Sequence, residues 1–234
     1  MTSAPVTFIT GSSRGIGRHL VEHCLARGHT VVGCSRSASD LQDQRYEHFL
    51  CDISQESEVI QVFSKIRDKH GRLDHLVNNA GIAATNHAML IPAKTAQRIL
   101  EVNVMGNLFA SREAARLMQQ RKFGRIVNFS TIAVVHKIAG EAMYAASKAA
   151  VVTLTQVLAK EFAPYGITVN AIGPTPIQTD ILKSLPQAKL DAVISRQAIC
   201  RFGEFRDVAN VMDFFLQPES DFVTGQMVYL GGVS

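Results

Sequence analysis

The sequence predicts the α/β fold class, with a sheet of seven parallel strands covered by helices on both faces. Short apolar runs rich in β-branched residues alternate with stretches of helical periodicity along the chain. Several of these runs show no polar alternation, which is typical of strands buried on both faces. The 234 residues contain no internal repeat and no linker rich in Gly, Ser or Pro, so we expect residues 1–234 to form one domain.

The expected elements follow one another in regular order. Seven strands are expected at 6–10, 30–34, 48–51, 75–79, 125–130, 167–172 and 226–230, and helices at 16–27, 55–69, 93–119, 141–163 and 206–217. The stretch 55–69 has apolar residues at steps of three and four with charges between them, so one face should pack on the core. The residues of that face are Val59, Val62, Phe63 and Ile66.

Residues 176–200 interrupt this alternation between the sixth and seventh strands. The segment is helical in pattern and flanked by prolines. Long insertions near the carboxyl ends of strands often cover a ligand, so we expect a substrate lid here; a packing hairpin without ligand contact is the alternative.

Composition excludes several classes of protein. The net charge of +4 and the pI of about 9.0 come without a dense basic run, so nucleic acid is not an expected partner. The four cysteines show neither CxxC spacing nor a nearby histidine pattern, so no metal site or disulfide framework is expected. No charged leader with a long apolar stretch opens the chain, and no window reaches the roughly 18–20 apolar residues of a membrane span. We therefore expect a cytoplasmic protein with no membrane contact.

A glycine-rich turn follows the first strand and opens the first helix. In "TGSSRGIG" (10–17), the glycines Gly11, Gly15 and Gly17 match neither G-x-G-x-x-G nor a P-loop. They still allow the backbone to turn tightly and to direct a helix N-terminus at a pyrophosphate. A purely structural turn is the alternative, but the position after the opening strand favours dinucleotide binding.

The end of the second strand distinguishes between two cofactors. Proteins that bind NAD usually carry an acidic residue there for the ribose hydroxyls, whereas this chain has Ser35 followed by Arg36. Arg14 in the glycine loop can approach the same ribose. Two guanidinium groups without a carboxylate suit a 2′-phosphate, which favours NADPH over NADH. Two solvated surface arginines are the alternative.

A tyrosine and a lysine lie four residues apart in "MYAASK" (143–148), which places Tyr144 and Lys148 on one helical face. A free phenol has a pKa of about 10, and a nearby ammonium favours the phenolate. The tyrosine could then act as a general acid–base. A hydroxyl at the end of the preceding strand, from Ser130 or Thr131, could stabilise charge on a carbonyl oxygen. Without other motifs, a tyrosine and a lysine at this spacing more often lie on the solvated surface and have no catalytic role.

Other motifs along the chain support a catalytic role for this tyrosine and lysine. "TGSSRGIG", "CDIS" (51–54), "LVNNAG" (76–81), "VNVMG" (102–106), "YAASK" (144–148) and "VNAIGPTPIQTDI" (169–181) resemble, in order and spacing, the short-chain dehydrogenase/reductase superfamily. The resemblance covers essentially the whole chain and implies a Rossmann-like, doubly wound sheet. Within that superfamily, the chain is most similar to the 3-oxoacyl-[acyl-carrier-protein] reductases.

The resemblance implies a role for each matching position. Tyr144 would protonate the substrate carbonyl, Lys148 would lower its pKa and hold the nicotinamide ribose, and Asn103 would hold a water leading from Lys148 to solvent. The implied cofactor-binding residues are Gly11, Ser13, Arg14, Gly15, Ile16, Gly17, Ser35, Arg36, Asp52, Ile53, Asn79, Ala80, Gly81, Tyr144, Lys148, Pro174, Ile177 and Thr179. Asp74 would brace the sheet.

Three positions depart from the family pattern. The catalytic serine's position, thirteen residues before the tyrosine, holds Thr131, whose hydroxyl we expect to serve while Ser130 points to the opposite face. Thr175 replaces the glycine that usually follows Pro174, and this change could reshape the rim of the nicotinamide pocket. Leu230 replaces an acidic or amide residue before the final glycine pair, which could alter packing or an oligomer contact.

The resemblance also bears on partners. Two basic side chains near the entrance receive the acidic carrier protein in the acyl-carrier reductases; Lys122 matches one, while Tyr165 stands at the other. The implied assembly is a homotetramer that pairs the helices 93–119 and 141–163 between subunits.

The leading hypothesis is NADPH-dependent reduction of a ketone to a secondary alcohol, with a 3-oxoacyl thioester as substrate. An alcohol dehydrogenase or ketoreductase for a sugar, steroid, polyketide or small ketone is the alternative within enzymes. A non-catalytic regulator that binds NADPH is the alternative from another class; the combined presence of Asn103, Thr131, Tyr144 and Lys148 argues against it.

Overall fold

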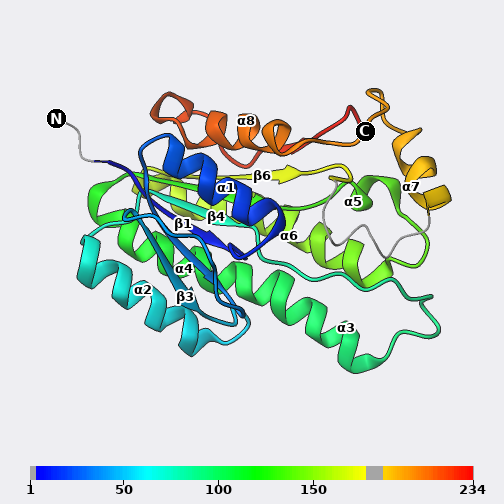
Figure 1. Cartoon of the computed structure of the whole chain (residues 1–234), viewed down its shortest axis with the longest axis horizontal. Coiled ribbons are helices and arrows are strands. Elements are labelled where there is room, and N and C mark those ends of the chain that lie inside the picture. The colour runs from blue at the N-terminus through cyan, green and yellow to red at the C-terminus, as the bar shows by residue number, and fades with distance from the viewer. Residues whose placement is uncertain (1–3, 178–186, 234) are drawn as a thin grey trace.

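A single parallel sheet organises the chain (Figure 1). The computed structural model describes residues 4–177 and 187–233. The strand order is β3-β2-β1-β4-β5-β6-β7, and all six pairings are parallel. The strands are β1 Val6–Thr10, β2 Thr30–Ser35, β3 Tyr46–Leu50, β4 His75–Asn78, β5 Gly124–Phe129, β6 Ile167–Gly173 and β7 Met227–Tyr229. The predicted fold class is therefore confirmed.

Helices cover both faces of this sheet (Figure 1). Helices α1 and α8 pack on one face, and α2, α4 and α6 on the other. The bounds are α1 Gly15–Ala26, α2 Glu56–His70, α3 Ala93–Leu100, α4 Gly106–Met118, α5 Ala133–His136, α6 Ala142–Phe162, α7 Gln187–Ile194 and α8 Phe205–Leu216. A π-helical turn occupies Glu101–Met105, and 3₁₀ turns occupy Gln119–Arg121, Ala163–Tyr165 and Pro218–Ser220.

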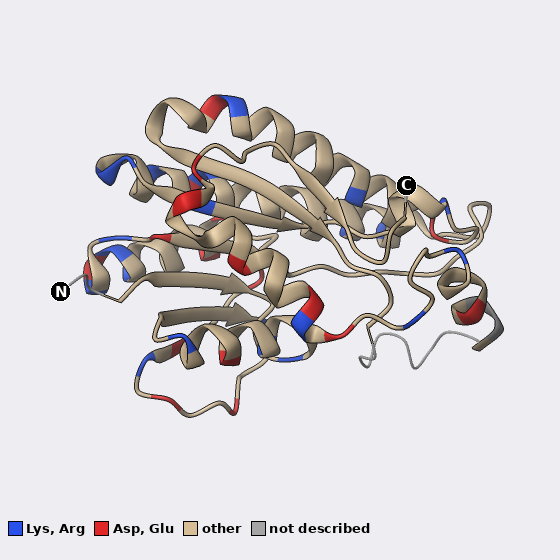
Figure 2. Ribbon diagram, turned by 90° about the horizontal axis from the view of Figure 1, so that it is seen from above, with Lys and Arg blue, Asp and Glu red and all other residues tan. Residues whose placement is uncertain are grey.

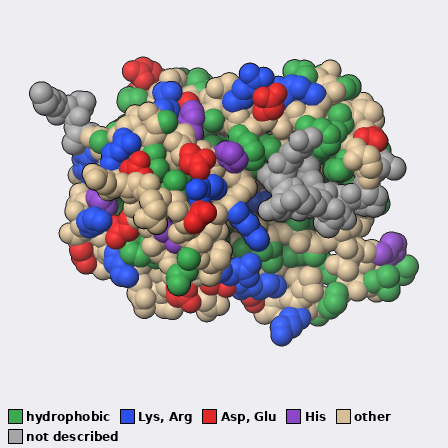
Figure 3. Space-filling view, viewed as in Figure 1, with side chains coloured by type: hydrophobic (Ala, Val, Ile, Leu, Met, Phe, Trp, Pro, Cys, Tyr) green, Lys and Arg blue, Asp and Glu red, His purple; other side chains and the backbone are tan. Residues whose placement is uncertain are grey.

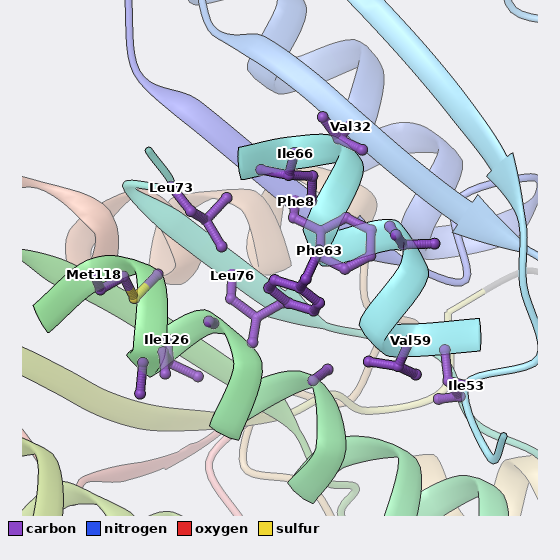
Figure 4. Close-up of a cluster of buried hydrophobic side chains, with 14 of the residues drawn as sticks. Phe8, Val32, Ile53, Val59, Phe63, Ile66, Leu73, Leu76, Met118 and Ile126 are labelled. Carbon is purple, nitrogen blue, oxygen red and sulfur yellow. The ribbon is translucent and has the colours of Figure 1, made fainter. Parts of the chain in front are cut away.

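Two hydrophobic cores follow from the alternation of side chains along the strands. In β1, Phe8 packs into the core beneath α2 and α4, while its neighbour Ile9 packs beneath α1 and α8. Figure 4 shows the first core, where the rings of Phe8 and Phe63 meet edge to face with centroids 5.2 Å apart. The predicted inner face of α2 is confirmed, since its four apolar residues are all buried.

The amino edge of the sheet is tied by polar side chains. The backbone N–H of Val6 donates to Asp74 Oδ2 at 2.8 Å, and Arg72 and Arg121 pair with the same carboxylate. This arrangement joins the starts of β1 and β4, which is the bracing role that the sequence led us to expect. Beside it, burial lowers the pKa of His75 to about 3.

Two expected boundaries were wrong. The helix expected over 93–119 is split, because the π-helical turn Glu101–Met105 separates α3 from α4. The third strand begins at Tyr46 rather than at residue 48 and ends at Leu50. Cys51 therefore lies just beyond the strand, although it is still buried.

The distribution of charge and the most apolar helix both bear on partner surfaces. Acidic and basic residues are interspersed around the helices rather than gathered by sign (Figure 2). Among the described residues, the stretch Ala142–Tyr165 is long and apolar enough to cross a membrane by length and composition, a test that a core helix also passes. Its inner face packs against β6.

Candidate active site

The candidate residues gather at the carboxyl edge of the sheet. Gly11 follows β1, Ser35 ends β2, Asp52 follows β3, Asn79 follows β4, and Thr131 follows β5. Since β1 lies between β2 and β4, the chain reverses direction along the sheet at this point. Ligands of open parallel sheets bind at such a reversal.

The glycine loop is shaped by close backbone packing. Gly11 and Gly15 have φ of +70° and +57°, a region that favours glycine. A Cβ on Gly17 would lie 2.1 Å from the carbonyl oxygen of Gly11, so only glycine allows helix α1 to start this close to the loop. Arg14 precedes the helix and is exposed. The start of α1 is therefore open to an anion, as a dinucleotide requires.

The segment after β4 is fastened to this loop. The side-chain amide of Asn79 donates to the carbonyl oxygens of Thr10 and Gly11 at 3.0 and 3.2 Å. The backbone N–H of Ala80 donates to the hydroxyl of Thr10 at 3.0 Å. At Gly81 a Cβ would lie 3.2 Å from Lys148 Nζ, which shows how closely this segment approaches the lysine.

The end of β2 carries hydroxyls and unpaired cations. Ser35 Oγ donates to the carbonyl oxygen of Ser37 at 2.7 Å, and Ser13 Oγ lies 3.2 Å from Ser37 Oγ. Arg14 and Arg36 are exposed and make no ion pair with any other described residue. The residues present thus fit a phosphorylated ribose. Figure 3 shows basic and acidic side chains next to one another on one face of the molecule.

Asp52 is held by other protein groups. Its Oδ1 accepts the N–H of Ser54 at 3.0 Å and the hydroxyl of Ser54 at 2.7 Å, and its Oδ2 pairs with Arg98. Burial alone would raise the pKa of Asp52, but these bonds outweigh it and hold the pKa below its ordinary value. Ile53 is buried against Gly106. Their expected contact with adenine remains a prediction.

The tyrosine meets the threonine rather than the serine. The hydroxyl of Thr131 lies near the phenol and lowers the pKa of Tyr144, and Thr131 Oγ1 accepts the N–H of Ala133 at 3.3 Å. Ser130 Oγ instead donates to the carbonyl oxygen of Lys148 at 3.1 Å. Of the two adjacent hydroxyls, the one expected to act is therefore the one beside the phenol.

The lysine is held by a backbone carbonyl, since its Nζ donates to the carbonyl oxygen of Phe129 at 2.7 Å. Burial raises the pKa of Tyr144, the Thr131 hydroxyl lowers it, and the Glu141 carboxylate raises it. The expected lowering of this pKa by Lys148 remains a prediction. Burial lowers the pKa of Lys148 to about 8.

Asn103 lies in the π-helical turn and connects two segments of the site. Its Nδ2 donates to the carbonyl oxygen of Ile82 and to Ser147 Oγ, both at 2.9 Å, and its Oδ1 accepts the N–H of Ile82 at 2.8 Å. Ser147 Oγ donates to the carbonyl oxygen of Tyr144 at 2.7 Å. The amide group of Asn103 thus joins the segment at Ile82 to the tyrosine helix, and its water-holding role remains a prediction.

The last expected residues lie after β6. Pro174 and Ile177 are buried, and Ile177 forms a bridge with Gly203. Thr175 is buried beneath Gly203 and Gly231. Thr179 and the middle of the expected lid lie outside the described residues.

The expected carrier contact does not lie at this edge. Lys122 precedes β5, at the amino end of the sheet, whereas Thr131 follows the same strand at its carboxyl end. Within one chain, Lys122 is therefore not at the entrance to the candidate site, contrary to the expectation from sequence.

Sequence reasoning missed four side chains that support this site. Ser147 holds the tyrosine helix, Arg98 pairs with Asp52, and Ser37 and His48 contact Ser35. Each acts through a tertiary contact. Only Ser147, one residue from the lysine in the tyrosine motif, carried a sequence signal.

Comparison with known proteins gives consistent matches over the full chain. A family model described as enoyl-(acyl carrier protein) reductase matches residues 11–233. The 3-oxoacyl-[acyl-carrier-protein] reductase FabG of Vibrio cholerae is 32% identical over 97% of this chain and 96% of its own length.

Solved structures match equally widely. The aldohexose dehydrogenase of Thermoplasma acidophilum superposes with a TM-score of 0.89 at 28% identity, over 98% of this chain and 93% of its own. ElxO with NADP bound superposes with a TM-score of 0.89 at 28% identity, over 97% of both chains.

Proposed function

The chain belongs to the short-chain dehydrogenase/reductase superfamily of NAD(P)-dependent oxidoreductases, and on that premise we propose that it reduces a ketone to a secondary alcohol with NADPH. The proposed substrate is a 3-oxoacyl thioester, as for the FabG relatives. The observation that carries this proposal is the placement of the Thr131 hydroxyl near the phenol of Tyr144, one helical turn from Lys148.

Three side chains would handle the carbonyl oxygen and its proton. Tyr144 donates its hydroxyl proton to the oxygen as negative charge develops there. Thr131, fixed by its bond from Ala133, donates a second hydrogen bond to the same oxygen. Lys148, one helical turn from Tyr144 and held by the Phe129 carbonyl, would stabilise the resulting tyrosinate.

The glycine loop and the end of β2 would hold the cofactor. When bound, the reduced nicotinamide supplies the hydride to the carbonyl carbon. The start of α1 offers N–H groups to the pyrophosphate, while Arg14, Ser35 and Arg36 receive the 2′-phosphate. Binding of ElxO to NADP is consistent with this choice of cofactor.

We further propose one domain with a lid at 176–200 and a homotetramer formed by the long helices. In the described part of the lid segment, Arg196 Nη1 donates to the carbonyl oxygen of His136 at 3.2 Å, which ties the segment to the loop after Thr131. Leu100, Met105 and Val157 are exposed apolar side chains on or beside the helices that would pair.

Acetoacetyl groups on acyl carrier protein, coenzyme A and a short thiol mimic test the substrate. We expect NADPH oxidation with all three, lost in Tyr144→Phe. A strong carrier preference that Lys122→Glu abolishes would support carrier docking at the amino edge. If none of the three thioesters is reduced at any rate above that of Tyr144→Phe, the thioester proposal is wrong.

A sugar or other small carbonyl compound is the second candidate. The structural match to an aldohexose dehydrogenase favours it, as does Tyr165, which stands at an expected carrier-binding position. Oxidation of an aldohexose with NADP⁺, without turnover of thioesters, would select this candidate. Absence of turnover with either class, together with tight NADPH binding, would select a non-catalytic regulator.

A further inference from the structure

The hydroxyl of Ser35 has two partners, and they fix the position of its proton. Ser35 Oγ lies 2.7 Å from the carbonyl oxygen of Ser37 and 2.8 Å from His48 Nε2. A carbonyl only accepts, and a hydroxyl has one proton to donate. Ser35 therefore donates to Ser37 and accepts from His48, so Nε2 of His48 carries a hydrogen.

This histidine lies on the edge strand β3, and the register of β3 against β2 brings it close to Ser35. His48 pairs with Gly33 of β2, two residues before Ser35. Tyr46 lies on the same face of β3, with its ring centroid 6.2 Å from that of His48, and its hydroxyl donates to Ser12 Oγ at 3.2 Å. A Cβ on Gly33 would lie 2.5 Å from the Tyr46 hydroxyl, so glycine is needed for β3 to reach the loop.

The charges around this cluster favour a dianion. Arg18, the other cation of the first helix turn, is neutralised by Asp40 and Glu22. Arg14 and Arg36 lack any such partner among the described residues. The serines next to them offer hydroxyls, and hydroxyls with guanidinium groups are the usual ligands of a phosphate monoester.

We propose that His48 is a specificity-determining positioning residue: it orients the hydroxyl of Ser35, and through it the Ser35–Ser37 turn, to receive the 2′-phosphate of NADPH. This inference rests on the proposed NADPH dependence. His48 acts through Ser35 and contacts only protein. Without the Nε2 hydrogen, Ser35 is free to rotate, and the turn loses the bond that holds it to the sheet.

Two adenine nucleotides separate this role from a general effect on folding. 2′,5′-ADP carries the 2′-phosphate, and 5′-AMP lacks it. For His48→Phe, which keeps a ring but no N–H, we expect affinity for 2′,5′-ADP to fall about tenfold, the scale of one hydrogen bond involving a charged group. Affinity for 5′-AMP should change by less than about twofold.

Two further variants complete the titration-calorimetry experiment. His48→Gln can place an amide N–H near the position of Nε2, so it should recover most of the 2′,5′-ADP affinity. His70→Phe, at the end of α2, removes a histidine near the amino end of the sheet and should change neither affinity.

Each outcome decides a separate point. If His48→Phe weakens both nucleotides equally, or leaves their ratio unchanged, His48 has no role in specificity, although NADPH dependence stands. Failure of His48→Gln to recover affinity also overturns the proposal. If the wild-type protein does not prefer 2′,5′-ADP to 5′-AMP, both the NADPH assignment and this inference are wrong.

Discussion

Replacing Thr131 by valine removes one hydroxyl and almost no volume. The hydroxyl that lowers the pKa of Tyr144 is lost, and the N–H of Ala133 loses an acceptor at 3.3 Å. That second bond is long, so the loss in folding free energy should be only about 1 kcal/mol. The main effect should therefore fall on catalysis.

The magnitude follows from the two functions of this hydroxyl. Loss of one donor to a developing oxyanion costs about 2.7–4 kcal/mol, or roughly 10²- to 10³-fold in kcat. Thr131 is also the one described group that lowers the pKa of Tyr144, against burial and Glu141, which raise it. Its loss should raise that pKa further.

Stopped-flow measurement of NADPH oxidation gives kcat, and the reverse reaction gives the pH dependence. Alcohol oxidation needs the deprotonated phenol, so its rate rises with pH through the pKa of Tyr144. In Thr131→Val this rise should move to higher pH, whereas Thr131→Ser should keep most activity and a nearly unchanged profile. Ser130→Ala is the matched control, because Ser130 bonds only to structural groups here.

Normal turnover by Thr131→Val would refute the assignment of this hydroxyl. So would a large loss of kcat in Ser130→Ala with Thr131→Val unaffected.

Three further changes test the electrostatics and packing. His75 has a folded-state pKa of about 3, below its unfolded value, so stability is lost as pH falls. Between pH 6.5 and 4.5 we expect urea unfolding to show a loss of about 2.3 kcal/mol, and a smaller loss in His75→Phe. Lys148 has a pKa of about 8 in the folded protein, below its value of about 10.5 in the unfolded chain. Burying its charge therefore destabilises the fold fully below pH 8, and this destabilisation disappears as the pH rises to about 10.5. Lys148→Met should therefore lose turnover yet gain up to about 3 kcal/mol at pH 7, and an unchanged Tm would contradict this. Gly17→Ala places a methyl group 2.1 Å from the Gly11 carbonyl oxygen, so we expect about 3 kcal/mol of destabilisation and loss of NADP⁺ binding; a wild-type Tm would show that the loop can move.

The sheet and its layers were predictable because their signals are local. Apolar runs without polar alternation mark strands buried on both faces, and α2 showed its inner face in its periodicity. The split after Leu100 was not predictable, since a π-helical turn leaves the apolar pattern almost unchanged. The start of β3 at Tyr46 depends on pairing with β2, which a single segment does not encode.

The candidate site divides in the same way. Thr131 and Tyr144 could be placed together because their spacing matches that of the catalytic serine and tyrosine in the resembling family. The direction in which Lys148 points could not, because a long flexible side chain selects among several acceptors, here the Phe129 carbonyl. His48 was invisible for a third reason: a histidine in a strand carries no signal of the serine it reaches on the next strand.

The position of β1 has a consequence for biosynthesis. This strand lies between β2 and β4, and its bond from Val6 to Asp74 spans 68 positions. At ribosomal rates of 5–20 residues per second, roughly 3–14 s separate the emergence of the two partners. During this interval β1 exposes one unpaired, hydrogen-bonding edge, to which chaperones that bind nascent chains could attach.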